Sequence, residues 1–222
     1  MIRVFDITLS LMALFILLPV LLPIALVLKF TGEGEVFFYQ ARVGKKGISF
    51  RLIKFATMLR DSPNIGTGTV TLKNDPRVLP FGRLLRATKI NELPQLLNVI
   101  FGDMSLIGPR PQTRRCFDAF KLEHQKYIVS VKPGLSGIGS IIFRNEEEML
   151  QSAENANLFY DTIIMNYKGK VEKWYVENLD LKTYLKLIIF TIIIVIKPNS
   201  ISVYDWFSDL PKIPDELSCW IK

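Results

Sequence analysis

The stretch ITLSLMALFILLPVLLPIALVL, residues 7–28, decides what kind of protein this chain is, because it carries no charge. As a straight helix these 22 residues would run roughly 33 Å, enough to cross the hydrocarbon core of a bilayer. Pro19 and Pro23 lie inside the stretch, and each proline removes a backbone donor and clashes with the carbonyl four residues earlier. The sequence therefore predicts a membrane helix that bends near its middle.

Three interpretations of this segment compete. A cleaved signal peptide is disfavoured, because the apolar run exceeds a typical signal core and no A-x-A-like site follows it. The length and the prolines of the segment do not distinguish a straight anchor from a broken, re-entrant helix that returns to the same face. Arg3 stands alone before the segment and basic residues crowd its other side, so the positive-inside rule predicts a cytoplasmic main body.

Composition narrows the protein class further. A chain of 222 residues with 49% hydrophobic and 22% charged residues fits one domain, or one domain plus a membrane segment. Two cysteines and one histidine exclude a disulfide framework and argue against a zinc site, which favours a reducing, cytoplasmic setting. Residues 1–135 carry 19 Lys and Arg against 9 Asp and Glu, whereas the remainder carries 9 against 12. The basic part should face anions, either a phospholipid surface or nucleotide phosphates; nucleic acid is disfavoured because aromatic residues are not interleaved with the basic ones.

Periodicity predicts an α+β fold for the rest of the chain. Residues 36–40 and 48–55 read as the two strands of a β-hairpin, joined by a turn at 44–47. Asn91 is the expected N-cap of a helix that Gly102 ends in the left-handed conformation. Residues 145–177 look helical but polar, and 185–196 form an apolar helix too short to span, either in the core or lying on the bilayer.

A family resemblance rests on several ordered motifs. They run from Phe37-Phe38-Tyr39-Gln40-x-Arg42-x-Gly44 through Lys54-Phe55-x-Thr57-Met58, Asn74-Asp75-Pro76-Arg77, Glu92-Leu93-Pro94-Gln95-Leu96-Leu97-Asn98-Val99, Gly102-Asp103-Met104-Ser105-Leu106-Ile107-Gly108-Pro109-Arg110-Pro111, Val131-Lys132-Pro133-Gly134-Leu135-Ser136-Gly137 and Trp174-Tyr175-Val176-Glu177-Asn178. In these the chain resembles the bacterial sugar transferase family, the small monotopic phosphoglycosyl transferases. The likeness extends to about residue 200.

The resemblance implies an activity and a setting. Such enzymes move a sugar 1-phosphate from a UDP-sugar to polyprenol (undecaprenyl) phosphate, with Mg²⁺, at the cytoplasmic face of the inner membrane. This reaction opens exopolysaccharide, lipopolysaccharide, capsule or glycan-carrier assembly. The implied domains are a re-entrant helix at 1–30, a mainly helical catalytic domain with a short hairpin and interfacial helices at 31–200, and a C-terminal tail at 201–222. The family's helix break falls on Pro19, where Leu18 replaces the usual preceding Ser.

The implied catalytic pair departs from the family pattern. The family has Asp-Glu where this chain has Asn91-Glu92, and the family's Asp attacks the sugar-bearing phosphate to form a covalent intermediate. An amide is not a workable nucleophile, whereas a carboxylate is. Three alternatives stay open: Glu92 is the nucleophile, the lipid phosphate attacks directly, or the chain is an impaired scaffold that binds its ligands without turnover.

The resemblance also implies supporting residues. Arg86 and Arg110 match phosphate-binding arginines, and Lys54 matches a basic position near the site; a guanidinium fork suits a diphosphate. Glu92 and Glu172 are the predicted metal carboxylates, because Mg²⁺ prefers oxygen ligands together with substrate phosphates. The sugar is not readable from the sequence. The tail, with Trp206, Phe207 and Trp220, suggests a membrane contact or a homodimer contact.

Overall fold

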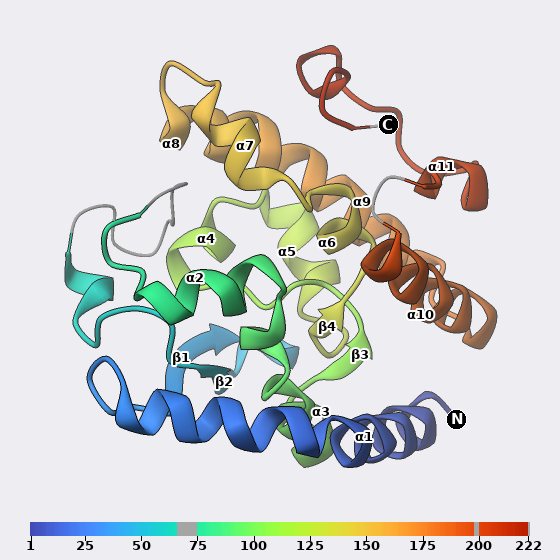
Figure 1. The fold of residues 1–222 in the computed structure, drawn as a ribbon. Helices are drawn as coiled ribbons and strands as arrows, with labels where there is room; N and C mark the ends of the chain where they lie inside the picture. The colour runs from blue at the N-terminus through green and yellow to red at the C-terminus, as the bar shows by residue number, and fades with distance from the viewer. Residues whose placement is uncertain (66–74, 198–199, 222) are drawn as a thin grey trace.

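The computed structural model describes residues 1–65, 75–197 and 200–221 (Figure 1). Residues 66–74 of the loop expected at 61–80, which include Asn74 of the motif, and Pro198-Asn199 after the last apolar run lie outside the described residues. The elements are α1 (Ile2–Phe30), β1 (Phe37–Val43), β2 (Ser49–Phe55), α2 (Pro80–Ala87), α3 (Gln95–Phe101), β3 (Ser105–Ile107), α4 (Arg114–Asp118), α5 (Leu122–Ile128), β4 (Gly134–Ser136), α6 (Ile138–Ile142), α7 (Glu146–Gln151), α8 (Ala156–Phe159), α9 (Met165–Glu177), α10 (Leu181–Ile196) and α11 (Val203–Trp206).

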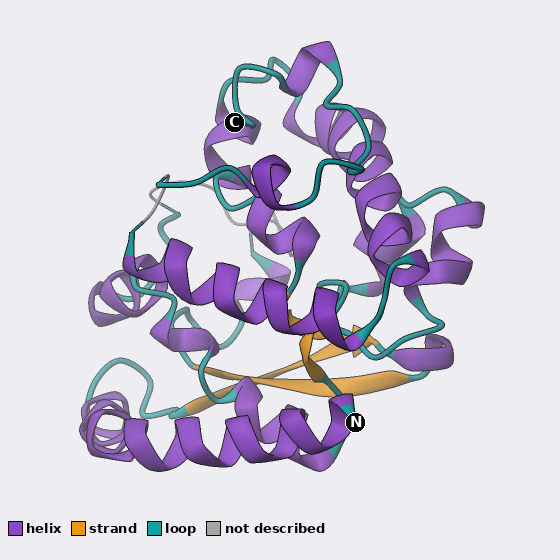
Figure 2. Ribbon diagram, turned by 90° about the vertical axis from the view of Figure 1, so that its right-hand side faces the viewer, coloured by secondary structure: helices purple, strands orange, loops and turns teal. Residues whose placement is uncertain are grey.

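Helix α1 is long and apolar enough to cross a membrane by length and composition, and it bends as predicted. In Figure 1 the C-terminal half of α1 lies in the plane of the picture, whereas its N-terminal half is seen foreshortened. In Figure 2, turned by 90°, the N-terminal half lies in the plane and the C-terminal half is foreshortened, so the two halves run in different directions. Pro19 and Pro23 lie inside the helix, and each interrupts its hydrogen-bond ladder. The helix exposes large apolar side chains to its surroundings, among them Leu11, Phe15, Ile16, Leu22 and Leu26.

The β-hairpin packs against the second half of α1. Strands β1 and β2 are antiparallel, with Phe37 opposite Phe55 and Phe38 opposite Lys54, which confirms the predicted hairpin. Side chains of paired residues share a face, and successive residues alternate between faces. Phe55 therefore faces α1, where it joins a cluster with Leu21, Ile24, Leu28 and Leu85, and Lys54 points to the opposite face of the hairpin.

The main core lies among the C-terminal helices. Helix α9 and helix α10 bury Val171, Tyr175, Tyr184, Leu187 and Phe190. Helix α10 also exposes Ile189, Ile192, Val195 and Ile196, so one face belongs to the core and the other is an apolar face that no described residue covers. The buried face fits the prediction of a core helix, and the exposed face fits the prediction of a helix that lies on the bilayer.

The predicted start of the helix that Gly102 ends was wrong. Asn91 does not cap a helix, because it lies inside a 3-10 turn (Ile90–Glu92), and α3 begins only at Gln95. Pro94 has no N–H to donate to the carbonyl of Ile90, so the turn closes instead through the N–H of Leu93 at 3.1 Å. Gly102 ends α3 with a φ of 98°, as predicted.

The segment 145–177 is helical but not polar in its packing. It is divided into α7, α8, a π-helical turn (Tyr160–Ile164) and α9. Lys168 and Glu172 on α9 are only 2% and 1% exposed, so two of the charged residues that made the segment look polar are buried.

The tail packs on the body through its aromatic residues. The ring of Trp206 lies 5.3 Å from that of Phe190, and the ring of Phe207 lies 5.4 Å from that of Trp174. Leu217 and Ile221 are buried in the main core. Trp206 and Phe207 thus have partners inside the chain.

Candidate active site

Three segments far apart in the sequence bring two cations and one carboxylate together. Oε1 of Glu92 accepts hydrogen bonds from Nζ of Lys54 and from Nη2 of Arg110, each at 2.8 Å. Nη1 of Arg110 lies 3.4 Å from Oε2 of the same carboxylate. The structure therefore brings together three of the residues predicted from the sequence, and we call Lys54, Glu92, Arg110 and the neighbouring Arg42 the charged cluster.

Local structure explains how each side chain reaches this point. Lys54 projects from the hairpin face opposite α1, and Glu92 closes the 3-10 turn that a left-handed Lys89, with a φ of 59°, begins. Arg110 follows β3, which pairs in parallel with β4. At Gly108 a Cβ atom would lie 2.5 Å from the carbonyl oxygen of Lys132, so only glycine permits this close approach.

Burial and neighbouring charges set the protonation states of Glu92 and Lys54. Burial alone would raise the pKa of Glu92, but the Arg110 and Lys54 cations hold it well below its usual value. Burial lowers the pKa of Lys54 to about 8, although Glu92 acts in the opposite direction. Glu92 is therefore ionised at neutral pH, while Lys54 loses its proton near physiological pH.

Arg42 is a further cation of the site, and the sequence motif that contains it assigned it no role. Burial and the positive charge of Arg110 lower the pKa of Arg42 to about 10. Its Nη1 donates to the carbonyl oxygen of Pro111 at 3.1 Å. Three cations thus surround one carboxylate, and this excess of positive charge suits a ligand that carries two or more negative charges.

Asn91 lies beside Glu92 and is buried, with only 5% of its surface exposed. Its Oδ1 has no hydrogen-bond partner among the described residues. A buried polar atom without a partner is costly and is rare in proteins, so this amide oxygen is suited to a ligand.

Arg86 is not part of the charged cluster. It lies on α2, where its Nη2 is 3.5 Å from the carboxylate of Glu147 on α7 and its Nη1 is 3.7 Å from the sulfur of Met58. Its side chain is 27% exposed, so it remains accessible to an anion that displaces Glu147.

Glu172 contacts Arg110 from the main-chain side. Its Oε1 lies 3.5 Å from the backbone nitrogen of Arg110, and burial raises its pKa to about 7. Gly139 leaves room for this carboxylate, since a Cβ there would lie 2.3 Å from Oε1. The structure thus links Glu172 to the backbone of Arg110 rather than to the carboxylate of Glu92. In the part of the chain that the structure describes, no group of three or more His, Cys, Asp or Glu is arranged to hold a metal ion.

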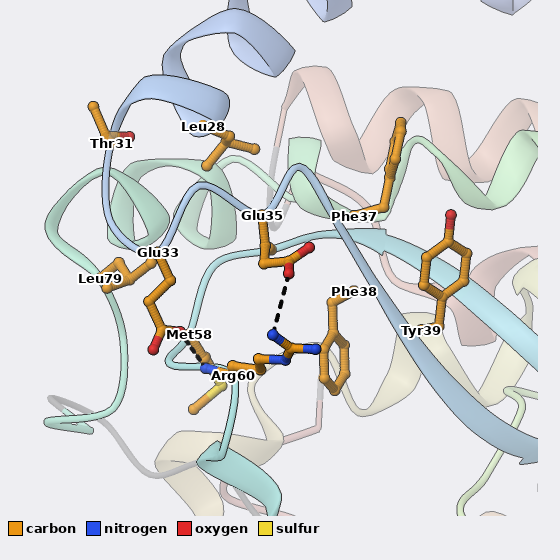
Figure 3. Close-up of a pocket in the computed structure, with 11 residues that line it drawn as sticks. Leu28, Thr31, Glu33, Glu35, Phe37, Phe38, Tyr39, Met58, Arg60 and Leu79 are labelled. Atoms are coloured by element: carbon orange, nitrogen blue, oxygen red, sulfur yellow. Dashed lines mark hydrogen bonds and ion pairs between the residues drawn. The ribbon is translucent and has the colours of Figure 1, made fainter.

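A cavity of about 270 Å³ lies between the end of α1 and the hairpin (Figure 3). An ion pair of Arg60 with Glu35, at 3.6 Å, crosses its polar side, and the backbone N–H of Arg60 donates to Glu33. Met58 lines the cavity and also contacts Arg86, so the cavity borders one of the predicted phosphate-binding residues. Its lining residues are Leu28, Thr31, Glu33, Glu35, Phe37, Phe38, Tyr39, Ala56, Met58, Arg60 and Leu79.

Comparison with known proteins gives a family match over most of the chain. The family described as Bacterial sugar transferase matches residues 1–198. The exopolysaccharide production protein ExoY of Rhizobium meliloti (strain 1021) is 34% identical over 184 residues, which cover 73% of this chain and 81% of ExoY.

Two longer relatives carry more specific names. The UDP-glucose:undecaprenyl-phosphate glucose-1-phosphate transferase of Escherichia coli (strain K12) is 38% identical over 160 residues, covering 68% of this chain and 33% of that protein. The UDP-N-acetylgalactosamine-undecaprenyl-phosphate N-acetylgalactosaminephosphotransferase of Aeromonas hydrophila is 39% identical over 142 residues, covering 63% of this chain and 33% of that protein. This chain spans about a third of the length of each.

Proposed function

The chain belongs to the bacterial sugar transferase family, and from this membership we propose that it transfers a sugar 1-phosphate from a UDP-sugar to undecaprenyl phosphate. The product is a lipid-linked diphosphosugar that initiates exopolysaccharide assembly. The observation that carries the proposal is the charged cluster, in which Lys54, Arg42 and Arg110 surround the single carboxylate of Glu92. Named relatives act on different sugars, glucose and N-acetylgalactosamine, so the sugar is left to experiment.

The assay for this proposal is release of UMP from a panel of UDP-sugars by the full chain in lipid nanodiscs with undecaprenyl phosphate. We expect release to require the lipid phosphate. Binding of UDP-sugars without turnover on any sugar would instead indicate the scaffold, an alternative that the relatives, which are named as transferases, do not support.

The cations of the site have a direct chemical role in this reaction. Both substrates are phosphates, and two anions approach each other only where positive charge neutralises them. Arg110 is the natural ligand for the diphosphate, since its guanidinium can bind two oxygens at once, while Lys54 supplies a point charge. Arg86 joins them when the diphosphate displaces Glu147.

We propose direct transfer without a covalent enzyme intermediate. An oxygen of the lipid phosphate attacks the sugar-bearing phosphorus, the bond from that phosphorus to the oxygen of UMP breaks, and UMP leaves with the electron pair. The attacking phosphate needs no general base, because its second pKa is near 6 and it is largely dianionic at neutral pH. Glu92, which holds Lys54 and Arg110 at 2.8 Å, spaces these cations for the two phosphates.

The residues present also suit Mg²⁺. Glu92 supplies a carboxylate, and the amide oxygen of Asn91, which has no partner among the described residues, supplies a second, neutral oxygen. Glu172 is the other predicted ligand, but its contact with Arg110 favours a structural role. Bound there with the diphosphate, Mg²⁺ would neutralise negative charge on the phosphates.

The pH dependence of kcat/KM tests the role of Lys54. Because the pKa of Lys54 is about 8, its positive charge is lost as the pH rises through that value. We expect kcat/KM for the UDP-sugar to fall above pH 8 by up to about tenfold per pH unit. Lys54→Arg should move this limb to higher pH, since a guanidinium stays protonated. A limb that stays near pH 8 in the variant would show that Lys54 does not cause it.

For the membrane, we propose that α1 is re-entrant and that the body lies on the cytoplasmic face of the inner membrane. Both ends of α1 contact the same body: Arg3 binds backbone carbonyls at the end of α3, and Leu28 packs with Phe55 and Leu85. A straight span would put its two ends on opposite faces of the bilayer. The exposed apolar face of α10 is then free to rest on lipid.

Labelling with a membrane-impermeant maleimide tests this topology. Cys219 is exposed and reports the side of the body, Cys116 is buried, and a cysteine in a short extension before Met1 reports the N-terminus. We expect both reporters to react in inverted inner-membrane vesicles and neither to react in intact spheroplasts. Reaction of the N-terminal cysteine in spheroplasts would mean that α1 spans the membrane.

A further inference from the structure

A buried carboxylate near the start of the membrane helix joins three elements of the body. Oδ1 of Asp6 accepts hydrogen bonds from the hydroxyl of Ser105, the backbone N–H of Leu106 and the hydroxyl of Tyr184, each at 2.8 Å. Asp6 is 2% exposed. Burying a carboxylate in an apolar helix costs free energy, so its presence here calls for a function that its hydrogen bonds serve.

Arg3 makes a second attachment one helical turn earlier. Its Nη1 and Nη2 donate to the backbone oxygens of Val99 and Ile100, at 2.5 Å and 2.8 Å. These carbonyls lie at the C-terminal end of α3, where a cation complements the helix dipole. Arg3 therefore holds the helix that directly follows the turn bearing Glu92.

Asp6 holds the strand that leads to Arg110. From β3 the chain runs through Gly108 and Pro109 to Arg110, and it is tied to β4 by hydrogen bonds of Gly108 with Ser136 at 2.9 Å and of Gly134 with Pro109 at 2.8 Å. No residue between Leu106 and Arg110 has a positive φ, and the two prolines beside Arg110 stiffen the segment. A displacement of β3 is thus carried to Arg110.

We propose that Asp6 is a positioning residue of the active site: through β3 it sets Arg110 opposite Glu92, so that the first turns of the membrane helix are part of the catalytic frame. The inference rests on the proposed function and extends it. It also gives the helix a task besides anchoring, because a helix that only anchored the body would need no buried carboxylate.

A double-mutant cycle on the affinity for the UDP-sugar separates positioning from general stabilisation. In nanodiscs, by calorimetry, Asp6→Leu should weaken binding about tenfold in the otherwise natural chain, a coupling of ordinary size for groups that act through one another. In an Arg110→Met background the same change should weaken binding less than twofold, because the residue it positions is gone. Asp6→Asn should keep most of the affinity, since its amide Oδ1 can still accept the three hydrogen bonds.

The matched control is Ser10→Ala. Ser10 lies one helical turn after Asp6, is fully buried, and its hydroxyl has no partner among the described residues, so its loss should leave affinity within twofold. Thermal unfolding in the same nanodiscs shows that each variant is folded. Equal weakening by Asp6→Leu in both backgrounds, or no weakening at all, would overturn the proposal. Binding by the natural chain without turnover would instead count against the proposed function and leave this inference standing.

Discussion

Glu92→Gln is expected to lower kcat/KM for sugar-phosphate transfer by about 10²–10⁴-fold while the protein stays folded. The carboxylate accepts from Lys54 and Arg110 through Oε1, and a glutamine oxygen could still accept there, but the amide carries no negative charge and would turn its NH₂ group toward Nη1 of Arg110. Without the anion the two cations repel each other and separate, so the geometry that receives the diphosphate is lost.

Steady-state rates of UMP release measure this effect, and Glu177→Gln is the control. Glu177 also pairs with a cation, Lys173 at 3.8 Å, but on an exposed surface of α9, so its change should leave the rate within twofold. If Glu92 were only a stand-in for the substrate phosphate, its removal would tighten UDP-sugar binding and leave kcat intact. That outcome would exclude Glu92 from the chemistry.

Asn91→Asp is expected to raise kcat by about tenfold or more and to change the kinetic pattern. The new carboxylate would lie beside Glu92 in a site with excess positive charge, where an additional anion is tolerated. A carboxylate can attack the sugar-bearing phosphorus, so the reaction could divide into two steps with a covalent intermediate. Splitting one difficult step into two easier ones is the physical reason for the gain.

Two measurements test this change together. Initial rates at varied concentrations of both substrates should give intersecting lines for the natural chain and parallel lines for the variant. After acid quenching, label from the β-phosphate of the UDP-sugar should remain on the variant and not on the natural chain. Asn91→Ala is the control, because it removes the amide without adding a nucleophile. Labelled protein from the natural chain would refute direct transfer and point to Glu92 as the nucleophile.

Sequence patterns anticipated the elements that rest on local chemistry. The uncharged run with Pro19 and Pro23 predicted the bent helix, and the alternation of apolar and polar residues predicted the hairpin. Gly102 was predicted as the end of α3 because only a left-handed residue closes a helix in that way. Motif resemblance supplied Lys54, Glu92 and Arg110, which the fold brings together.

What the sequence could not reveal depends on partners distant along the chain. Asp6 appears only as a charge at the edge of an apolar run until Ser105 and Tyr184 are brought to it. The burial of Lys168 was not predicted, because nothing local marks Glu146, on another helix, as the partner that permits it. Arg42 likewise had no assigned role in its motif until the hairpin placed it near Arg110.

The fate of the β-phosphorus of the donor distinguishes transfer of a sugar 1-phosphate from transfer of the sugar alone. The full chain in nanodiscs is given undecaprenyl phosphate and a UDP-sugar labelled in either the α- or the β-phosphate, and lipid is extracted into organic solvent. Our account predicts that the β-label enters the lipid and that the α-label stays in water-soluble UMP. If the lipid gained the sugar without the β-label, or gained neither, the account of a sugar 1-phosphate transfer would be contradicted.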